Sequence, residues 1–217
     1  MIAAMAAALT GTSIESTTRD AILDAAERRF AEAGFDGAST REIAADVGLK
    51  NQASLYHYFE NKQSIYEAVL RRGVESLLAV ITDSARAGAL READGTARGE
   101  QLASYLDRTF DYLVAHPHLA RLIQRASLDE GGIAREIVAR LVQPLFDGGV
   151  RLLQDARGAW PPDELPHVAA GLYHLIFGYF SDMALLSAVM DDDPASGTSI
   201  ARQRSFVRAA VARLLTA

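Results

Sequence analysis

The segment from Thr40 to Lys62 combines features that few folds can accommodate in so short a stretch. Ile43, Ala44 and Val47 recur at the spacing of one face of a helix, and Gly48 ends that pattern. A second pattern over residues 52–59 starts with polar and small residues and finishes with aromatic ones. A helix, a sharp turn containing glycine and a second helix with a polar start are the sequence form of a helix-turn-helix. The segment therefore predicts a pair of helices packed at a fixed angle, with a polar surface left outside.

Apolar residues recur at a helical period through the rest of the chain, and alternation of period two is absent. We therefore expect an all-α fold, with a three-helix unit that contains the helix-turn-helix followed by a larger helical bundle. About nine helices are expected, over Thr18–Ala33, Ser39–Val47, Gln52–Phe59, Lys62–Ala87, Gln101–Ala115, His118–Ala126, Ile133–Ala156, His167–Met190 and Ile200–Leu215. The expected division is a disordered tail over residues 1–16, a helix-turn-helix domain over 17–77 and a C-terminal domain over 78–217.

Several single residues give the expected helix ends. Gly34 should end the first helix, and Ser39 with Glu42 forms the sequence pattern of a capping box. Asn61 can cap the long fourth helix. Pro144 should kink or split its helix, because it removes one backbone hydrogen bond. Asp182 is the one acid in an apolar stretch, so it should meet an arginine, a hydroxyl or solvent.

The composition narrows the function classes. The chain has no cysteine, which rules out disulfides and thiolate metal sites and suits a cytoplasmic location. Its formal charge of −6 gives no overall basic footprint, and residues 17–62 hold six Lys and Arg against eight Asp and Glu. DNA binding would therefore require the acids of this region to face away from the DNA. No membrane association is expected, because His174, Ser181 and Asp182 interrupt the most apolar stretch.

The run from Thr17 to about Val80 resembles the DNA-binding domain of the tetracycline-repressor (TetR) family. The match is carried by "AILDAAERRFAEAGFDGAST", "REIAADVGL", "SLYHYFENK" and "SIYEAVL". The resemblance implies a dimeric DNA-binding transcriptional regulator, typically a repressor that leaves its operator when a small, largely apolar ligand binds. It also implies a roughly palindromic operator in double-stranded DNA, because a two-fold dimer presents two identical reading heads.

The expected DNA contacts fall into two groups. By resemblance, Thr40, Arg41, Tyr56, Tyr58 and Lys62 lie near the phosphate backbone. Lys50, Asn51, Gln52, Ala53, Ser54 and His57 are placed to read bases, and lysine, asparagine and glutamine suit base edges chemically. The chain departs from the family's common spacing, because Gly48 and Leu55 lie seven steps apart instead of six. Which of Lys50, Asn51 and Gln52 contacts a base therefore stays open.

The C-terminal region resembles the family only in its helical architecture. We expect a ligand pocket among the middle helices, with the candidates Leu77, Tyr105, Phe110, Leu113, Leu122, Leu141, Phe146, Tyr173 and Phe177. A four-helix dimer interface is expected from the last two helices, with the candidates Leu172, Leu175, Tyr179, Met183, Leu186, Val207, Val211 and Leu214. For each pocket candidate, plain core packing is the competing interpretation.

Two other function classes stay open at this point. The chain could be a helical binding or enzyme domain with no operator-binding role, or it could be an activator or a DNA binder with no small-molecule ligand. We expect no enzyme activity and no cofactor, because no phosphate loop, nucleophile elbow or catalytic triad is evident. We expect no metal site, because the histidines lack the i, i+4 spacing of a helical metal site.

Overall fold

The structure is a computed structural model. It describes the backbone of residues 2–81, 94–128, 132–156 and 160–216, and the side chains in these ranges except at residues 2–16, 81, 95–98, 133, 215 and 216.

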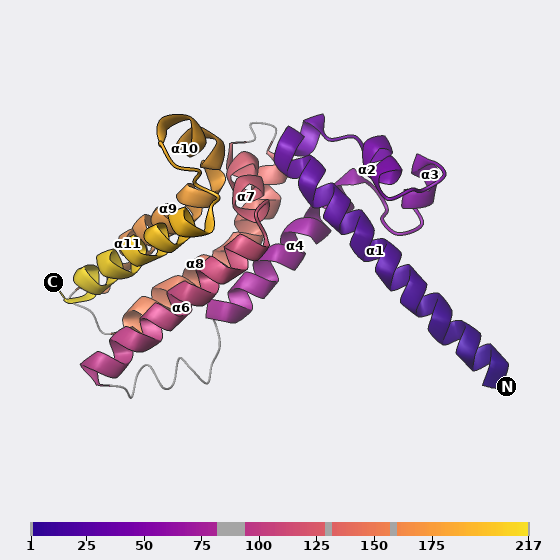
Figure 1. Cartoon of the computed structure of the whole chain (residues 1–217). Coiled ribbons are helices and arrows are strands. Elements are labelled where there is room, and N and C mark those ends of the chain that lie inside the picture. The colour runs from indigo at the N-terminus through magenta and orange to yellow at the C-terminus, as the bar shows by residue number, and fades with distance from the viewer. Residues whose placement is uncertain (1, 82–93, 129–131, 157–159, 217) are drawn as a thin grey trace.

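This part of the chain is all-helical, as predicted, and contains ten helices and no strand. The helices are α1 (Ile2–Gly37), α2 (Thr40–Asp46), α3 (Gln52–Leu55), α4 (Lys62–Ile81), α6 (Gly95–Ala115), α7 (Leu119–Ser127), α8 (Ile133–Ala156), α9 (Leu165–Ser181), α10 (Met183–Val189) and α11 (Gly197–Thr216). Figure 1 shows α2 and α3 at one end of the molecule and the antiparallel pair α9 and α11 at the other end. The helices α4, α6, α7 and α8 lie between these two ends.

Several helix boundaries differ from those expected. The first helix begins at Ile2 instead of Thr18, and its N-terminal part extends away from the other helices (Figure 1). The third helix ends at Leu55 and continues only as turns, so it is shorter than the expected 52–59. Part of the loop expected over 87–100 is helical, because α6 begins at Gly95. The expected end of the fourth helix near Ala87 lies outside the described residues.

The expected single helix over His167–Met190 is instead two helices, α9 and α10, which meet at Asp182 with a bend of 73°. Asp182 accepts a hydrogen bond from Gln124 Nε2 at 2.8 Å and a longer one of 3.4 Å from Ser181 Oγ. A hydroxyl partner was among those predicted, and the amide was not. No single helix among the described residues is long and apolar enough to cross a membrane, and α9 with α10 passes that test only as the bent pair.

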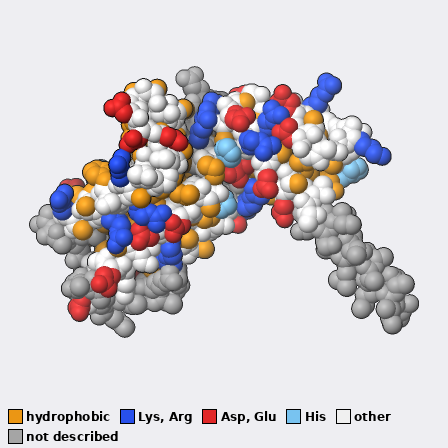
Figure 2. All heavy atoms as spheres, in the orientation of Figure 1, with side chains coloured by type: hydrophobic (Ala, Val, Ile, Leu, Met, Phe, Trp, Pro, Cys, Tyr) orange, Lys and Arg blue, Asp and Glu red, His pale blue; other side chains and the backbone are white. Residues whose placement is uncertain are grey.

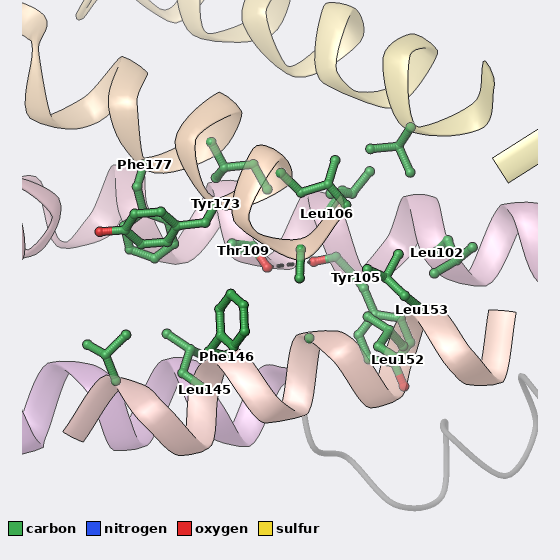
Figure 3. A pocket seen from close by; sticks show the side chains of 16 residues that line it. Leu102, Tyr105, Leu106, Thr109, Leu145, Phe146, Leu152, Leu153, Tyr173 and Phe177 are labelled. Atoms are coloured by element: carbon green, nitrogen blue, oxygen red, sulfur yellow. Dashed lines mark hydrogen bonds between the residues drawn. The ribbon is translucent and has the colours of Figure 1, made fainter. Parts of the chain in front are cut away.

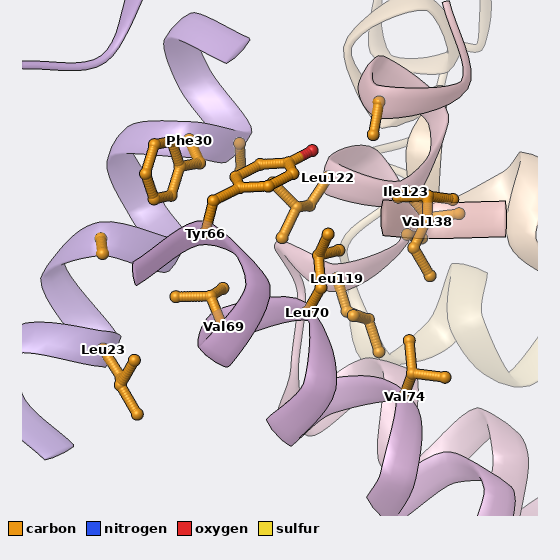
Figure 4. Packing of buried hydrophobic residues seen from close by; sticks show 14 of the residues in the cluster. Leu23, Phe30, Tyr66, Val69, Leu70, Val74, Leu119, Leu122, Ile123 and Val138 are labelled. Atoms are coloured by element: carbon orange, nitrogen blue, oxygen red, sulfur yellow. The ribbon is translucent and has the colours of Figure 1, made fainter. Parts of the chain in front are cut away.

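The N-terminal helices share a core with the body of the molecule. Tyr66 of α4 is buried between α1 and α7, with its ring in edge contact with Phe30 at a centroid distance of 4.9 Å (Figure 4). Ile43 of α2 and Leu55 after the turn are fully buried in the same cluster. Because this core continues through Leu122 of α7 into the bundle, the N-terminal helices are fixed against the body by apolar packing.

Glycines and caps set the geometry of the N-terminal helices. Gly34 has a φ of 76°, so α1 is interrupted where an end was predicted and then continues for one further turn. Asn61 caps α4 as predicted, because its Oδ1 accepts from Ser64 N at 2.8 Å. The capping box predicted for Ser39 does not form, since the Ser39 side chain makes no cap hydrogen bond. The Glu42 carboxylate lies 3.8 Å from the Arg29 guanidinium, which draws it away from the cap.

α8 runs over Ile133–Ala156 as predicted and is not split at Pro144. α4 connects the N-terminal helices to the body and approaches α7 closely at Gly73. A Cβ atom at Gly73 would lie 2.6 Å from Leu119 Cδ1, and the Gly73 carbonyl accepts a hydrogen bond from Tyr112 of α6. The division of the chain into residues 1–16, 17–77 and 78–217 stays a proposal, because α4 and the shared core cross the boundary at residue 77.

Candidate nucleic-acid interface

The turn between α2 and α3 depends on Gly48. Its φ of +71° is a conformation that residues with a side chain rarely adopt. The Leu49 amide then donates to the Ala44 carbonyl at 2.9 Å, which closes the end of α2. Leu55 and Phe59 are buried behind the turn, and Ile43 faces them from α2. This packing fixes α3 against α2 and leaves the opposite side of α3 outside.

The structure places the eleven predicted DNA-contacting residues on one connected region, with different exposures. The exposed ones are Arg41, Lys50, Asn51, Ala53, Tyr56 and His57. Gln52, Ser54, Tyr58 and Lys62 are partly buried, and Thr40 is buried. Exposed side chains are free to meet DNA, whereas the partly buried ones already have contacts within the chain.

Asn51 is the N-cap residue of α3. Its Oδ1 accepts hydrogen bonds from the Ser54 amide at 3.0 Å and from Ser54 Oγ at 3.2 Å. This is the N-cap arrangement, in which a side chain satisfies a backbone donor of the first turn. The cap occupies the carbonyl end of the Asn51 amide, which a bidentate contact to adenine would also need.

Gln52 bridges the two helices. Its Nε2 donates to Thr40 Oγ1 at 2.6 Å and to the Tyr56 hydroxyl at 3.0 Å. Side-chain hydrogen bonds with Thr40 and Gln52 lower the pKa of the Tyr56 hydroxyl below its ordinary value. Because both donor positions of this amide are used, Gln52 holds Tyr56 in place and has no donor left for a base.

Lys62 and Tyr58 are also engaged within the chain. Lys62 Nζ donates to the Asp36 carbonyl at 3.1 Å and lies 4.9 Å from the centroid of the Phe35 ring. Tyr58 packs against the buried core. These contacts link the end of the helix-turn-helix to the last turn of α1.

The two acids of α2, Glu42 and Asp46, are paired with arginines of α1. Asp46 accepts two hydrogen bonds from Arg29, at 2.7 and 2.8 Å, and these bonds together with Arg28 lower the pKa of its carboxyl. Asp24 and Glu27 of α1 form ion pairs with Arg72 of α4. Within the described residues, Arg41 and Lys50 form no ion pair. Lys and Arg side chains accordingly project at the end of the molecule occupied by α2 and α3 (Figure 2).

Comparisons with known proteins agree with this geometry. Residues 22–69, which span the turn and the packed helices around it, match the family model of bacterial regulatory proteins of the tetR family. The N-terminal region of the chain is therefore similar to that of tetR-family regulators.

Relatives and structural neighbours of this chain are named as regulators. The transcriptional repressor Rv1474c of Mycobacterium tuberculosis is 30% identical over 106 residues, which are 49% of this chain and 51% of that protein. The repressor NicS of Pseudomonas putida is 24% identical, over 88% of each chain. The fatty acid degradation regulator FadR of Bacillus halodurans shares the fold, with a TM-score of 0.63, 16% identity, and coverage of 87% of this chain and 97% of that one. These proteins are transcription regulators and not enzymes, in agreement with the expectation for this chain.

The coverage of these relatives differs. The chain spans about half the length of the Mycobacterium relative, and 88% of the Pseudomonas relative. The family model is confined to residues 22–69, so the C-terminal region of the chain is described by its own geometry.

The C-terminal region of the chain contains an apolar cavity of about 130 Å³ between α6, α8 and α9, lined on one side by Val211 of α11 (Figure 3). Four of the nine predicted pocket residues line it, namely Tyr105, Phe146, Tyr173 and Phe177. The other five lie outside its walls. Leu77, Phe110, Leu113 and Leu122 are fully buried core, and Leu141 packs against that core.

Sequence reasoning missed most of the wall that α8 contributes. Its lining residues are Val142, Leu145, Phe146, Gly149, Leu152 and Leu153. Their spacing is that of one helix face, so the signal was present in the sequence. What the sequence did not show is which helices stand opposite this face.

The predicted dimer residues are only partly available to a second chain. Tyr179, Val207 and Val211 are buried within the chain itself. Leu172, Leu175, Met183, Leu186 and Leu214 are partly buried, and Leu172 and Val211 line the cavity. Phe206 of α11, with 57% of its surface exposed, and Leu185 and Val189 of α10 are large apolar side chains that the prediction did not include.

Proposed function

We propose that this protein belongs to the TetR family and is a dimeric, sequence-specific DNA-binding transcriptional repressor that acts in the cytoplasm. One observation carries the proposal: Arg41 and Lys50 beside α3 are exposed and form no ion pair among the described residues, while Glu42 and Asp46 of α2 pair with arginines of α1. Helix-turn-helix proteins insert the second helix of the motif into the major groove. Regulators of this family bind operator DNA and act as dimers.

We assign the DNA contacts within this interface by exposure and by which hydrogen-bonding or charged groups of each side chain are not already used within the chain. Lys50, Ala53 and His57 are exposed next to one another along α3 and the turns around it, so they are the proposed base readers. Arg41 and Tyr56 are the proposed phosphate contacts, with Thr40 and Gln52 holding the Tyr56 hydroxyl.

In this proposal, the remaining residues predicted to contact DNA position the helix-turn-helix. Asn51 and Ser54 shape the start of α3 through the cap. Lys62 and Tyr58 hold the end of the motif against α1 and the core, with Lys62 also close enough to the surface to add positive charge near the backbone.

A dimer gives the operator its symmetry. Two identical heads related by a two-fold axis require a roughly palindromic operator, with half-sites about one helical turn apart or a multiple of it. We propose that the outer faces of α9, α10 and α11 form the dimer interface. This face carries Phe206 and Leu185, both more than half exposed in the single chain, and large exposed apolar side chains are typical of contact surfaces.

The effector is proposed to bind in the cavity between α6, α8 and α9. A ligand there can release DNA only if it binds more tightly to a conformation whose heads do not fit the operator. The cavity is joined to the DNA-binding helices through the shared core, in which α4 packs on α8 and Tyr112 of α6 donates to the Gly73 carbonyl of α4. A change in the spacing of α6 and α8 would therefore be transmitted to α4.

The test is a mobility-shift titration of the purified chain with duplex DNA from the region upstream of its own gene. We expect a shift at low salt that weakens steeply as salt rises, and competition by that duplex but not by a scrambled one of equal length. Folded, dimeric protein that gives no shift at low salt would show that the chain has no operator-binding role at this DNA.

A further inference from the structure

The wall that α8 contributes to the cavity between α6, α8 and α9 includes one position without a side chain, Gly149. On α8, Gly149 lies three and four residues from Leu145, Phe146, Leu152 and Leu153, all of which line the cavity. A helix repeats its facing positions at this spacing, so Gly149 occupies the middle of the face that α8 turns inward. The corresponding positions one turn before and one turn after carry large apolar side chains.

Backbone geometry does not explain this glycine. Gly149 lies inside a helix, where glycine is less stable than alanine, and it does not have the positive φ of Gly34, Gly48 and Gly132. Close packing does not explain it either. A Cβ atom at Gly149 would meet nothing within 4 Å, in contrast to Gly73, where Leu119 stands in the way. The absent side chain at Gly149 therefore corresponds to open space within the fold.

The residues that line the cavity determine which class of ligand it can bind. No lysine, arginine, histidine, aspartate or glutamate is among the described residues that line it. Thr109 Oγ1 already donates to the Tyr105 carbonyl at 2.9 Å, which leaves its oxygen as an acceptor. Burial raises the pKa of Tyr173, so this hydroxyl is neutral at pH 7. An ion bound here would lose its hydration without gaining an oppositely charged partner. An uncharged molecule does not carry this desolvation cost.

The volume of the cavity and its aromatic side chains restrict the class of ligand further. The cavity volume of about 130 Å³ is close to that of an apolar cavity of about 150 Å³ known to hold benzene. Tyr173 and Phe177 stack with a centroid distance of 4.7 Å at one end of the cavity, and Phe146 faces them from α8 (Figure 3). Rings at such a wall favour offset or edge contacts with a further ring.

We propose that Gly149 keeps open a binding site for an uncharged molecule of about the size of one aromatic ring, with at most one small polar group. This identifies the chemical class of the effector and rests on the proposed function only for the release of DNA. Binding itself is measurable without DNA, so failure of the two proposals can be told apart.

The experiment uses the purified full-length chain and two probes of matched size, benzyl alcohol and benzoate. Calorimetric titration and the melting temperature measure binding, because a ligand selective for the folded state raises the melting temperature. We expect benzyl alcohol to bind and benzoate to bind about tenfold more weakly or not at all. Equal binding of both probes, or no binding of benzyl alcohol, would overturn the proposed ligand class.

Gly149→Leu places a side chain in the cavity and should weaken benzyl alcohol binding by about tenfold or more. Gly99→Leu is the matched control, since Gly99 is a helical glycine on the exposed surface of α6 with nothing near its Cβ position. That variant should bind the probe as the wild type does. If Gly149→Leu does not fold, Gly149→Ala serves instead, with a smaller loss of affinity and no decrease in melting temperature. Unchanged probe binding in a folded Gly149 variant would show that the ligand does not occupy this space.

Operator binding is the second readout. The Gly149 variants should shift operator DNA as the wild type does, and benzyl alcohol should release DNA from the wild type at lower concentration than from Gly149→Leu. A wild type that binds benzyl alcohol without any release of operator would refute the effector role of the site and leave DNA binding as a separate result.

Discussion

Gln52 Nε2 lies 2.6 Å from Thr40 Oγ1, so the first residue of α3 is hydrogen-bonded to the first residue of α2. The same amide donates to the Tyr56 hydroxyl at 3.0 Å. The two helices that should enter and flank the groove are therefore tied together through one side chain, and this side chain also orients an exposed tyrosine. We propose that Gln52 acts on DNA through Tyr56.

Gln52→Ala should lower affinity by about threefold to tenfold for every operator variant alike, because one bridging hydrogen bond of about 1 kcal/mol is lost. The measurement is fluorescence anisotropy with a panel of single-base operator variants. Thr40→Val is the matched control, since it removes the same bond from the other side and should give the same uniform decrease. A changed ranking of the operator variants with Gln52→Ala would mean that Gln52 reads a base.

Arg41→Ala should reduce the salt dependence of operator binding by about one phosphate, or roughly 0.9 in the slope of log affinity against log salt. The reason is that Arg41 is exposed and forms no ion pair among the described residues. Arg28→Ala is the control, because Arg28 pairs with Asp46 on the far side of α2 at 3.4 Å. Equal slopes for the wild type and Arg41→Ala would remove Arg41 from the phosphate contacts.

Operator affinity should fall as the pH rises toward 10, and the fall should begin below the ordinary pKa of tyrosine. Hydrogen bonds to Thr40 and Gln52 lower the pKa of Tyr56, and a tyrosinate next to phosphate is repelled. The free energy of unfolding should change in the opposite direction. Between the lowered pKa and about 10 the unfolded chain binds more protons, so stability rises with pH there.

The control for this pH profile is Tyr56→Phe, which retains the ring and lacks the titrating group. Anisotropy titrations over the same pH range should show a flatter profile for this variant. Superimposable profiles for the wild type and Tyr56→Phe would show that another group governs the decrease.

Gly73→Ala should lower the free energy of unfolding by about 1 kcal/mol, although alanine favours helices. Its Cβ would lie 2.6 Å from Leu119 Cδ1, and Leu119 is itself fully buried, so the overpacking exceeds the gain in helix propensity. Chemical denaturation measures the change. Adding Leu119→Ala should make the double variant more stable than the sum of the single changes predicts, and strict additivity would argue against the close contact.

Phe206→Glu should convert the dimer to a monomer and reduce operator affinity at least about tenfold, because a charge would then enter the proposed apolar interface. Light scattering after size exclusion measures the mass. Arg202→Glu is a nearby control on α11, at an exposed position where Arg202 pairs with Asp192. A dimer that survives Phe206→Glu would place the interface elsewhere.

Much of the fold could be predicted because it depends on local pattern. The bounds of α8 follow from its helical periodicity, and the Asn61 cap and the break at Gly48 follow from the chemistry of single residues. The resemblance of the N-terminal region to a known family predicts a DNA-binding surface on α2 and α3, and this stays a prediction.

The features of the fold and of the site that could not be predicted depend on contacts between residues that are distant in the sequence. The Ser39 capping box fails because Glu42 approaches Arg29 of another helix, and Asp182 marks a bend because Gln124 of α7 reaches it. The same reason applies to the interface, where neither the Gln52 bridge nor the use of Asn51 as a cap follows from spacing. The cavity was predicted only in part, since its shape is set by the helices that face Gly149.

The most direct test of operator binding is a footprint of the wild-type protein on DNA from the region upstream of its own gene. We predict two protected half-sites with two-fold symmetry, spaced by about one helical turn or a multiple of it. At the same salt concentration, Tyr56→Ala and His57→Ala should give weaker protection. Absence of protection by folded, dimeric protein at low salt, or protection that both variants leave unchanged, would contradict the assignment of α3 as the DNA-reading helix.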